Sequence, residues 1–512
     1  MMLEYTQVEE ISSLVDNARR VFDSKVLTVQ NRLNQLRNLY YVLLDHQTQF
    51  EDALNKDFNR SQFETSRLEL AQVFGEILYV MRYLESWSKP QKVEYLPLSF
   101  GTTYSTVEKI PLGVILIIAP FNYPIVLSLS PIIGAIAAGN TVVFKPSELT
   151  PNCSTLLTEV LQSCFDYPIV SVVNGGITET QKLLKQKFDK IMFTGSEHVG
   201  KAVSKAAAEQ LTPVILELGG KSPCFLTSNC KATKIKTLLS RIIWSSFVNS
   251  GQTCVAVDYL LVDESIYSTV VEESTKILEE FYGTITDKSD FTHLIDRKSF
   301  KRTVTTLQKT KGKKISFGVA HENTNFVPPT LICDVSWDDE TMRSENFAPI
   351  LPIIKYSTIE DAVSKVKTNH DTPLACYIFS EDPREQRYIL NNLRSGGVCI
   401  NETMMHVGLY TAPFGGVGNS GYGNYHGKWS FESFSHSRTV LKQPLWAEFL
   451  IKARYPPYTK KNRATLELLD KGVVWFDRSG NVPSRRSYLT KVIGCCGLMV
   501  TVAVALLAKL VF

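Results

Sequence analysis

Cys254 has surroundings that suit nucleophilic chemistry. It ends the segment Ser250-Gly251-Gln252-Thr253-Cys254, whose small and polar side chains leave the thiol accessible. A thiolate in such a place is a potent nucleophile toward a carbonyl carbon. A lone cysteine is more often structural, so this interpretation depends on what the rest of the chain supplies.

Two other side chains are of the types that would assist such an attack. Glu217 lies at the apolar strand end Leu216-Glu217-Leu218, where burial would raise the pKa of its carboxyl and suit it as a general base. Asn122 lies between two prolines in PFNYP, where its amide could donate to an oxyanion, and one such donor is worth about 10²–10³ in rate. The alternatives are a paired structural glutamate and an ordinary turn asparagine.

Two segments have the residue types of a dinucleotide site. In FTGSEHVG, Gly195, Ser196 and Gly200 join an apolar strand to a good helix former, and a helix N-terminus preceded by a glycine turn suits a pyrophosphate. In FKPSE, Lys145 and Glu148 leave the end of another strand, where they would meet ribose hydroxyls. Taken alone, an ordinary βα turn explains the first segment equally well, and a solvated loop explains the second slightly better.

The most tempting glycine motif is misleading. Residues 416–421, GVGNSG, match GxGxxG but lack the preceding strand, the βαβ unit and the later acid that give this pattern its meaning. We expect a glycine-rich loop where backbones pass closely. The eight histidines are dispersed and no group of residues has metal-ligand spacing, so we predict no metal site.

Short apolar runs alternate with amphipathic stretches and would position these residues. Residues 11–90 are predicted to be helical, with Leu36, Leu39 and Leu43 at helical spacing in the stretch Val29–His46. Continuous apolar strands at this spacing indicate a parallel, doubly wound sheet covered on both faces. The predicted strands are 113–119, 141–145, 169–173, 190–194 and 213–216. A second α/β block is expected from about residue 223 to 405.

Length and charge narrow the class of protein. A chain of 512 residues suggests two to four domains, and 21% charged with 44% hydrophobic residues indicates a globular chain. A net charge of +4, spread along the chain, does not indicate a nucleic-acid-binding surface. The first residues carry acids and lack the apolar core of a secretory signal, and the ten cysteines form no CxxC pair. A reduced, cytosolic setting follows.

The C-terminal segment differs from the rest. No charged residue occurs between Val492 and Ala508, and Arg485, Arg486 and Lys491 precede this run. A spanning helix needs about 20 apolar residues, with a cationic flank on the cytosolic side. We therefore expect a single tail anchor with the bulk of the protein in the cytosol, the alternative being a buried core helix.

The motifs together, in their order, resemble the aldehyde dehydrogenase superfamily over roughly residues 10–440. The resemblance implies that Cys254 is the nucleophile, Glu217 the general base and Asn122 the oxyanion donor. It also implies a cofactor site, to which the segment Glu345-Asn-Phe347-Ala-Pro349 adds a glutamate that holds the nicotinamide ribose. The implied cofactor residues are Lys145, Glu148, Gly195, Ser196, Gly200, Glu345 and Phe347.

Residues 413–438 and the segment RYPPY are similar to the signatures of the class 3, fatty aldehyde dehydrogenase branch. Two positions depart from the pattern: Ala348 replaces a usual glycine and Val257 a usual proline. The implied fold is α/β, with a Rossmann-type cofactor domain, an α/β catalytic domain and a C-terminal transmembrane helix. Residues 1–220 would form the N-terminal helices and the cofactor domain, with a bridging hairpin near 92–110. Residues 221–405 would form the catalytic domain, and residues 406–440 would return to the cofactor domain and the bridging segment. Residues 441–488 would form a C-terminal extension with a gating helix at Ala464–Trp475, and residues 492–512 the membrane anchor.

The implied activity is oxidation of medium- and long-chain fatty aldehydes to carboxylic acids through a thiohemiacetal and a thioester at Cys254. NAD is expected because Glu148 would repel a 2′-phosphate, with NADP as the alternative. Aromatic aldehydes stay possible as substrates, and a homodimer is expected. The mitochondrial outer membrane, the endoplasmic reticulum and lipid droplets are the candidate membranes. Two alternatives stay open: a relative that passes the thioester to coenzyme A, and a catalytically silent membrane tether.

Overall fold

The computed structural model describes residues 3–470 and 476–482. The chain divides into two compact units, one of Met1–Lys89 and Lys109–His436, the other of Pro90–Glu108 and Ser437–Phe512. Within the described ranges, no helix has the length and apolar character needed to cross a bilayer. The tail anchor predicted at residues 492–512 and residues 471–475 of the predicted gating helix lie outside the described residues.

The N-terminal region is helical, as its periodicity predicts. Leu36, Leu39 and Leu43 all lie on the buried side of α2, where helical spacing puts them together. A π-helical turn, η1, interrupts the run just before the longest of these helices. The elements are α1 (Ile11–Asp23), α2 (Val29–Asp45), α3 (Gln47–Phe58), α4 (Gln62–Thr65), η1 (Ser66–Leu70) and α5 (Ala71–Ser88).

A six-stranded sheet follows, in the order β15-β7-β6-β3-β4-β5. Its strands are β3 (Val114–Ile118), β4 (Thr141–Lys145), β5 (Val170–Val172), β6 (Lys190–Gly195), β7 (Val214–Leu218) and β15 (Gly421–Tyr422). All neighbours pair in parallel except β15, which pairs antiparallel with β7. The five strands predicted from apolar runs are confirmed. The order places β3 beside β6, which is the switch point of a doubly wound fold.

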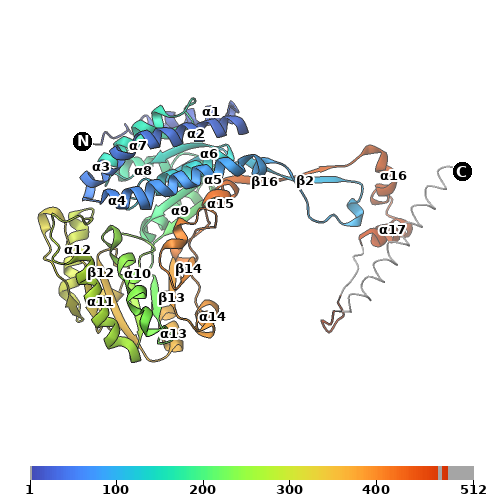
Figure 1. Cartoon of the computed structure of the whole chain (residues 1–512). Coiled ribbons are helices and arrows are strands. Elements are labelled where there is room, and N and C mark those ends of the chain that lie inside the picture. The colour runs from blue at the N-terminus through green and yellow to red at the C-terminus, as the bar shows by residue number, and fades with distance from the viewer. Residues whose placement is uncertain (1–2, 471–475, 483–512) are drawn as a thin grey trace. The chain divides into compact units, whose positions relative to one another are not determined.

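Both faces of this sheet are covered, which is why the central positions of its strands are mainly apolar. Ile115 and Ile117 of β3 pack in one cluster, which includes the side chains of α6 and α7. Val114 and Leu116 point the other way and pack in a second cluster with α1, α8 and α9. The covering helices are α6 (Val126–Ala138), α7 (Pro151–Ser163), α8 (Ile177–Leu184) and α9 (Glu197–Ala208); Figure 1 shows them around the sheet.

The second sheet has seven strands in the order β10-β11-β12-β9-β8-β13-β14. They are β8 (Pro223–Leu226), β9 (Tyr259–Asp263), β10 (Lys313–Ile315), β11 (Thr330–Cys333), β12 (Ile350–Tyr356), β13 (Ala375–Phe379) and β14 (Gly397–Ile400). The helices are α10 (Ile235–Phe247), α11 (Tyr267–Tyr282), α12 (Arg297–Lys309), α13 (Ile359–Asn369) and α14 (Pro383–Asn392).

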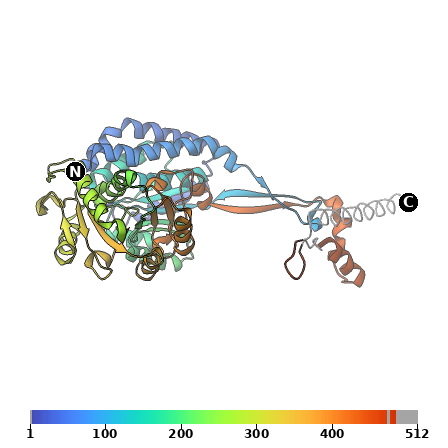
Figure 2. The same ribbon diagram turned by 60° about the horizontal axis from the view of Figure 1, so that its bottom comes forward.

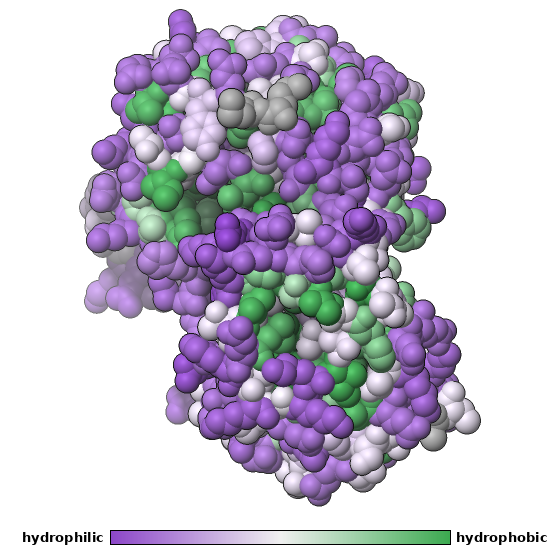
Figure 3. Space-filling model, turned by 90° about the vertical axis from the view of Figure 1, so that its left-hand side faces the viewer, coloured by the Kyte–Doolittle hydropathy of each residue, from purple (hydrophilic) through white to green (hydrophobic). Residues whose placement is uncertain are grey.

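Figure 3 shows a mainly hydrophilic face on which apolar side chains gather in hollows.

After β14 the chain returns to the first sheet. It adds β15 at the free edge of β7 and then α15 (Gly427–Ser433), which packs on α6. The packing is close, because a Cβ on Gly134 of α6 would lie 2.2 Å from the Cβ of Ser430. Residues far apart in the sequence therefore complete the six-stranded sheet and one of its covering layers of helices.

The second unit contains a three-stranded sheet in the order β1-β2-β16 (Figure 2). Arg438 of β16 pairs with Glu108 of β2 at 2.7 Å. Its elements are β1 (Gln91–Lys92), β2 (Tyr104–Pro111), β16 (Ser435–Lys442), α16 (Glu448–Ile451) and α17 (Lys460–Asp470). The described part of the predicted gating helix is helical, as the last turns of α17.

Candidate active site

The residues singled out by motif lie at one edge of the first sheet. Lys145 and Gly195 end β4 and β6, Glu217 is the penultimate residue of β7, and Asn122 follows β3. Parallel strands present their carboxyl ends at the same edge, and ligands bind outside that edge at a switch point. The separate sequence motifs thus become one constellation.

A left-handed turn, η4 (Val248–Gly251), presents Cys254. It follows α10, and Asn249, Ser250 and Gly251 have φ of 52°, 56° and 69°. Such backbone costs about 1–3 kcal/mol per non-glycine residue and persists only where the surroundings hold it. At Gly251 only glycine fits, because a Cβ would lie 2.2 Å from the carbonyl oxygen of Ala348. The turn before the thiol is therefore rigidly held.

Hydrogen bonds join this turn to the loop that carries Asn122. Asn122 Nδ2 donates to the backbone oxygen of Gln252 at 3.0 Å, and Asn249 Nδ2 donates to the backbone oxygen of Asn122 at 2.8 Å. The hydroxyls of Tyr123 and Thr253 are 2.8 Å apart. One Asn122 amide hydrogen is left for another acceptor beside the thiol.

Two buried carboxyl groups, those of Glu217 and Glu345, raise the pKa of the Cys254 thiol. Glu217 is 3% exposed, and burial raises its pKa to about 8, against a small opposing effect of the nearby Gly416 N–H. Neither of its oxygens makes a hydrogen bond in the described structure. Burial raises the pKa of Glu345 to about 8 as well, with Asp258 adding to the shift. Burial and then the charges of Glu345 and Glu217 raise the pKa of Cys254, so the resting group is a thiol.

A buried ion pair holds the loop that carries Asn122 in place. Arg60 and Glu69 are both fully buried and lie 2.6 Å apart. Glu69 accepts hydrogen bonds from the backbone N–H groups of Ile125 and Val126 at 2.6 and 3.0 Å. Arg60 donates to the backbone oxygen of Asn122 at 3.2 Å, and its guanidinium lies 4.5 Å from the centre of the Tyr123 ring. The pair fixes the loop on both sides of Tyr123.

The residues predicted to hold a dinucleotide fit such a ligand. Lys145 is buried and pairs with Glu148 at 2.6 Å at the end of β4. Ser196 is the N-cap of α9, with its hydroxyl accepting from Val199. At Gly200 a Cβ would lie 2.6 Å from the Leu218 side chain, so glycine lets α9 approach the sheet closely. A helix N-terminus beside a paired lysine and glutamate suits a pyrophosphate and a ribose.

The segment at Glu345 lies over the turn after β7. A Cβ on Gly219 would lie 2.2 Å from a carboxylate oxygen of Glu345, whose other oxygen is buried without a hydrogen bond. An orphaned buried oxygen at this place fits a hydroxyl of a bound ribose. Phe347 has φ of 45° and contacts Phe121 edge to face at 6.0 Å. Ala348 has no positive φ and is 3% exposed, so its methyl packs in the core without backbone strain.

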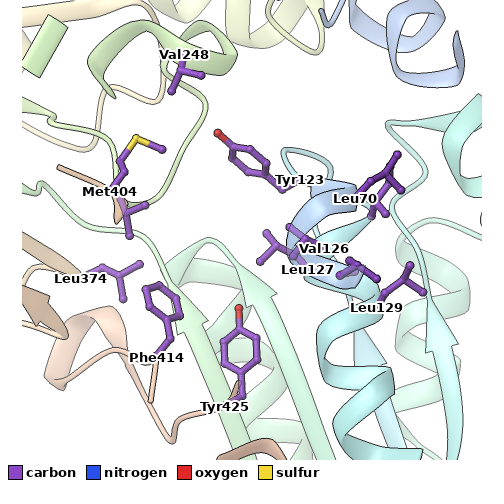
Figure 4. Packing of buried hydrophobic residues seen from close by; sticks show 14 of the residues in the cluster. Leu70, Tyr123, Val126, Leu127, Leu129, Val248, Leu374, Met404, Phe414 and Tyr425 are labelled. Atoms are coloured by element: carbon purple, nitrogen blue, oxygen red, sulfur yellow. The ribbon is translucent and has the colours of Figure 1, made fainter. Parts of the chain in front are cut away.

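Cys254 is one of the residues that line a cavity of about 310 Å³. Its walls come from η1 and α5, the start of α6, α10 and the 404–414 segment. Figure 4 shows Tyr123, Val126, Leu127, Met404 and Phe414 around a common space. The other lining residues are Arg67, Leu68, Ala71, Gln72, Trp244, Thr253, Val255, Met405, Val407, Gly408 and Tyr410. An apolar chain fits this cavity with its reactive end at the thiol.

The supporting residues Arg60 and Glu69 were not predicted from the sequence. A signal was present, because Glu69 and Glu76 share the apolar face of the helix with Val73 and Val80 at spacings of three and four. A carboxylate on such a face is buried and must have a partner.

The misleading glycine motif proves to be a close backbone crossing, as expected. Gly421 has φ of 121° and pairs with Glu217, and a Cβ on it would lie 1.9 Å from the Leu216 carbonyl oxygen. Among the residues that the structure describes, no group of three or more metal-ligating side chains occurs.

Comparison with known proteins agrees with this geometry. A model of the aldehyde dehydrogenase family matches residues 2–440. Fatty aldehyde dehydrogenase HFD1 of Saccharomyces cerevisiae is 43% identical over 500 residues, covering 94% of each chain. The dimeric NADP-preferring aldehyde dehydrogenase of the dog is 39% identical, covering 89% of this chain and 99% of its own. The substrate-bound AldH of Staphylococcus aureus superposes with a TM-score of 0.85 at 37% identity, covering 89% of this chain and 98% of its own. The chain therefore belongs to the aldehyde dehydrogenase family, in its class 3 branch, and is an oxidoreductase that acts on the aldehyde group with NAD or NADP.

Proposed function

We propose that this enzyme oxidises medium- and long-chain fatty aldehydes to carboxylic acids. The observation that carries the proposal is the mainly apolar cavity of about 310 Å³ that Cys254 lines. An alkyl chain gains about 0.8 kcal/mol for each methylene that it buries, so an apolar cavity favours long chains. The name of the Saccharomyces cerevisiae relative, a fatty aldehyde dehydrogenase, supports the same substrate class.

The site residues suggest the following roles. Cys254 gives its thiol proton to solvent and its thiolate attacks the aldehyde carbon. The free Asn122 amide hydrogen with the Cys254 backbone N–H stabilises the oxyanion. A bound nicotinamide would supply the hydride acceptor for this oxidation, and the substrate would then remain on Cys254 as a thioester. Glu217 then takes a proton from the water that attacks this thioester, and the acid is released. Because Glu217 is buried and carries no hydrogen bond, its lone pairs are free for that water.

The dinucleotide would lie against Lys145, Glu148 and the α9 N-terminus at Ser196, with Glu345 and Phe347 at the nicotinamide end. Glu148 favours NAD, because it would repel a 2′-phosphate. The name of the canine relative, NADP-preferring, keeps NADP within the proposal. That name also includes "dimeric", which supports a homodimer here.

We further propose that residues 492–512 anchor the enzyme in a membrane, with the catalytic part in the cytosol. The support is the run without charged residues between Val492 and Ala508 and the basic residues before it. The mitochondrial outer membrane, the endoplasmic reticulum and lipid droplets are the candidate sites, since fatty aldehydes partition into lipid.

The test is formation of NADH with hexadecanal by the full chain in detergent, compared with the variant Cys254→Ala. Turnover by the wild type and its loss in the variant are expected. Absence of turnover with NAD and NADP across short, long and aromatic aldehydes would overturn the proposal. Turnover that appears only on adding coenzyme A would assign the enzyme to acyl transfer instead.

A further inference from the structure

A buried ion pair contacts the segment that carries Glu345. Lys221 lies in the turn between β7 and β8, and Asp258 directly precedes β9. The two side chains are 2% and 7% exposed and form an ion pair with each other. Neither residue lines the cavity at Cys254. Two charges buried in this way are tolerated only where other hydrogen bonds use their remaining donors and acceptors.

Lys221 uses its remaining donors on the backbone just before Glu345. Its Nζ donates to the backbone oxygen of Thr341 at 2.9 Å and to that of Ser344 at 3.0 Å. Together with Asp258, these acceptors occupy all three N–H groups of the ammonium. Lys221 therefore holds the peptide group that joins Ser344 to Glu345.

Asp258 holds the backbone just after Glu345. Its Oδ1 accepts a hydrogen bond from the backbone N–H of Asn346 at 2.9 Å, and its backbone oxygen accepts one from Asn346 Nδ2 at 3.2 Å. Arg302 of α12 donates to the backbone oxygen of Asn346 at 3.2 Å. Glu345 thus lies between two residues that the opposite members of one ion pair fix in place.

The Glu345 carboxylate itself is left to meet a ligand. It lies against Gly219, where a Cβ would be 2.2 Å from one carboxylate oxygen, and its other oxygen is buried without a hydrogen bond. A binding group whose backbone is already ordered loses less freedom when the ligand arrives, so the ligand binds more tightly. The ion pair therefore supplies the order that the carboxylate needs.

We propose that Lys221 and Asp258 are positioning residues for the dinucleotide, because the pair holds the Glu345 carboxylate where it would meet the nicotinamide ribose. This rests on the proposed placement of the nicotinamide end at Glu345 and adds two residues that act through Glu345 rather than by contact with the aldehyde.

The test measures the dissociation constants of NAD and NADP by calorimetric titration of the full chain in detergent, without aldehyde. Lys221→Met/Asp258→Asn removes both charges together, so that neither is left buried and unpaired. It is expected to weaken binding of the dinucleotide about tenfold, as for loss of one hydrogen bond to a charged group. Asn346→Ala keeps both charges and removes only the side-chain amide on Asp258, and about threefold weaker binding is expected.

A double-mutant cycle separates positioning from a general loss of structure. Glu345→Ala removes the carboxylate and should by itself weaken binding about tenfold. If the pair acts through Glu345, adding Lys221→Met/Asp258→Asn to Glu345→Ala should weaken binding less than about twofold further, because coupled sites are not additive. Two effects that multiply to about a hundredfold would overturn the proposal.

Two controls accompany the cycle. Acylation of Cys254 by 4-nitrophenyl acetate needs no dinucleotide, and its rate in Lys221→Met/Asp258→Asn should stay within about twofold of the wild-type rate. Loss of this acylation would indicate a distorted site and overturn the proposal. Arg60→Met/Glu69→Gln removes a matched buried ion pair that contacts the Asn122 loop, and it should leave the dissociation constant of NAD unchanged.

Equally weakened NAD binding in Arg60→Met/Glu69→Gln would overturn the proposal, since any buried pair would then have the same effect. Unchanged NAD binding in both Lys221→Met/Asp258→Asn and Asn346→Ala would also overturn it. If Glu345→Ala bound NAD as tightly as the wild type, the proposed placement of the nicotinamide end would itself fail and this proposal with it, which the Glu345→Ala measurement alone reveals.

Discussion

Replacing Glu217 by glutamine separates the two halves of the proposed reaction. Glutamine keeps the size of the side chain and removes the base. Acylation of Cys254 should continue, because attack and oxyanion stabilisation use other groups, while hydrolysis of the thioester should slow. General-base catalysis contributes about 10²–10⁴-fold, so steady-state turnover of Glu217→Gln is expected to fall by that range.

The raised pKa sets the pH dependence of the wild type. With a pKa of about 8, Glu217 is mostly protonated at neutral pH and acts as a base only after it loses that proton. About a tenth of it is ionised at pH 7 and about nine tenths at pH 9. Hydrolysis of the thioester is therefore expected to rise about tenfold between these pH values, whereas a glutamate with an ordinary pKa would give a flat profile.

The assay follows the acyl-enzyme directly. Enzyme is loaded with aldehyde and NAD, and intact mass spectrometry then records loss of the acyl group from Cys254 at each pH. Glu217→Gln should show a full burst of NADH and a persistent acyl mass. The matched control is Glu76→Gln, which removes another buried carboxyl whose pKa burial raises to about 7, away from the cavity lining. A Glu217→Gln enzyme that keeps the pH rise, or loses burst and turnover equally, would refute the reasoning.

Two predictions concern the supports of the site. Arg60→Met leaves Glu69 buried without its cation and should destabilise the protein by about 3–5 kcal/mol, seen as a lower thermal midpoint that Arg60→Met/Glu69→Gln partly restores; an unchanged midpoint would contradict this. Gly251→Ala should cost more than about 1 kcal/mol and lower kcat, because its φ is 69° and the new Cβ meets the Ala348 carbonyl. Gly176→Ala, whose Cβ meets nothing nearer than 3.9 Å, should stay near wild type in both measurements.

Local pattern predicted most of the first sheet. A strand buried on both faces is apolar at its central positions, as Val142, Val143 and Phe144 are, so β4 at Thr141–Lys145 was predicted with both of its ends correct. In the second sheet, the short strands β10 and β14 were not predicted, since Lys313–Ile315 is mostly exposed and Gly397–Ile400 begins with glycine. Hydrogen bonding to the neighbouring strands β11 and β13, rather than their own amino-acid composition, makes these segments strands.

The site was predictable where its residues belong to short motifs. Lys145, Gly195 and Glu217 were placed at strand ends from sequence, and the parallel sheet then brought those ends together. The Arg60–Glu69 pair was not found, because its meaning depends on contacts with Asn122 and Ile125, more than fifty residues away. The apolar spacing of Glu69 indicates that it is buried, but the sequence alone does not identify Arg60 as its partner.

The three ionisable groups around the reactive thiol are best understood as one coupled set. Cys254, Glu217 and Glu345 lie close enough for each carboxylate to raise the thiol pKa, and burial penalises every charge among them. The site therefore disfavours more than one negative charge at a time, and its protons leave in steps that belong to the cluster. Ionisation of Glu217 opposes ionisation of Cys254. The base needed for hydrolysis is thus most easily charged once the sulfur is part of the neutral thioester, which is the stage at which hydrolysis requires it.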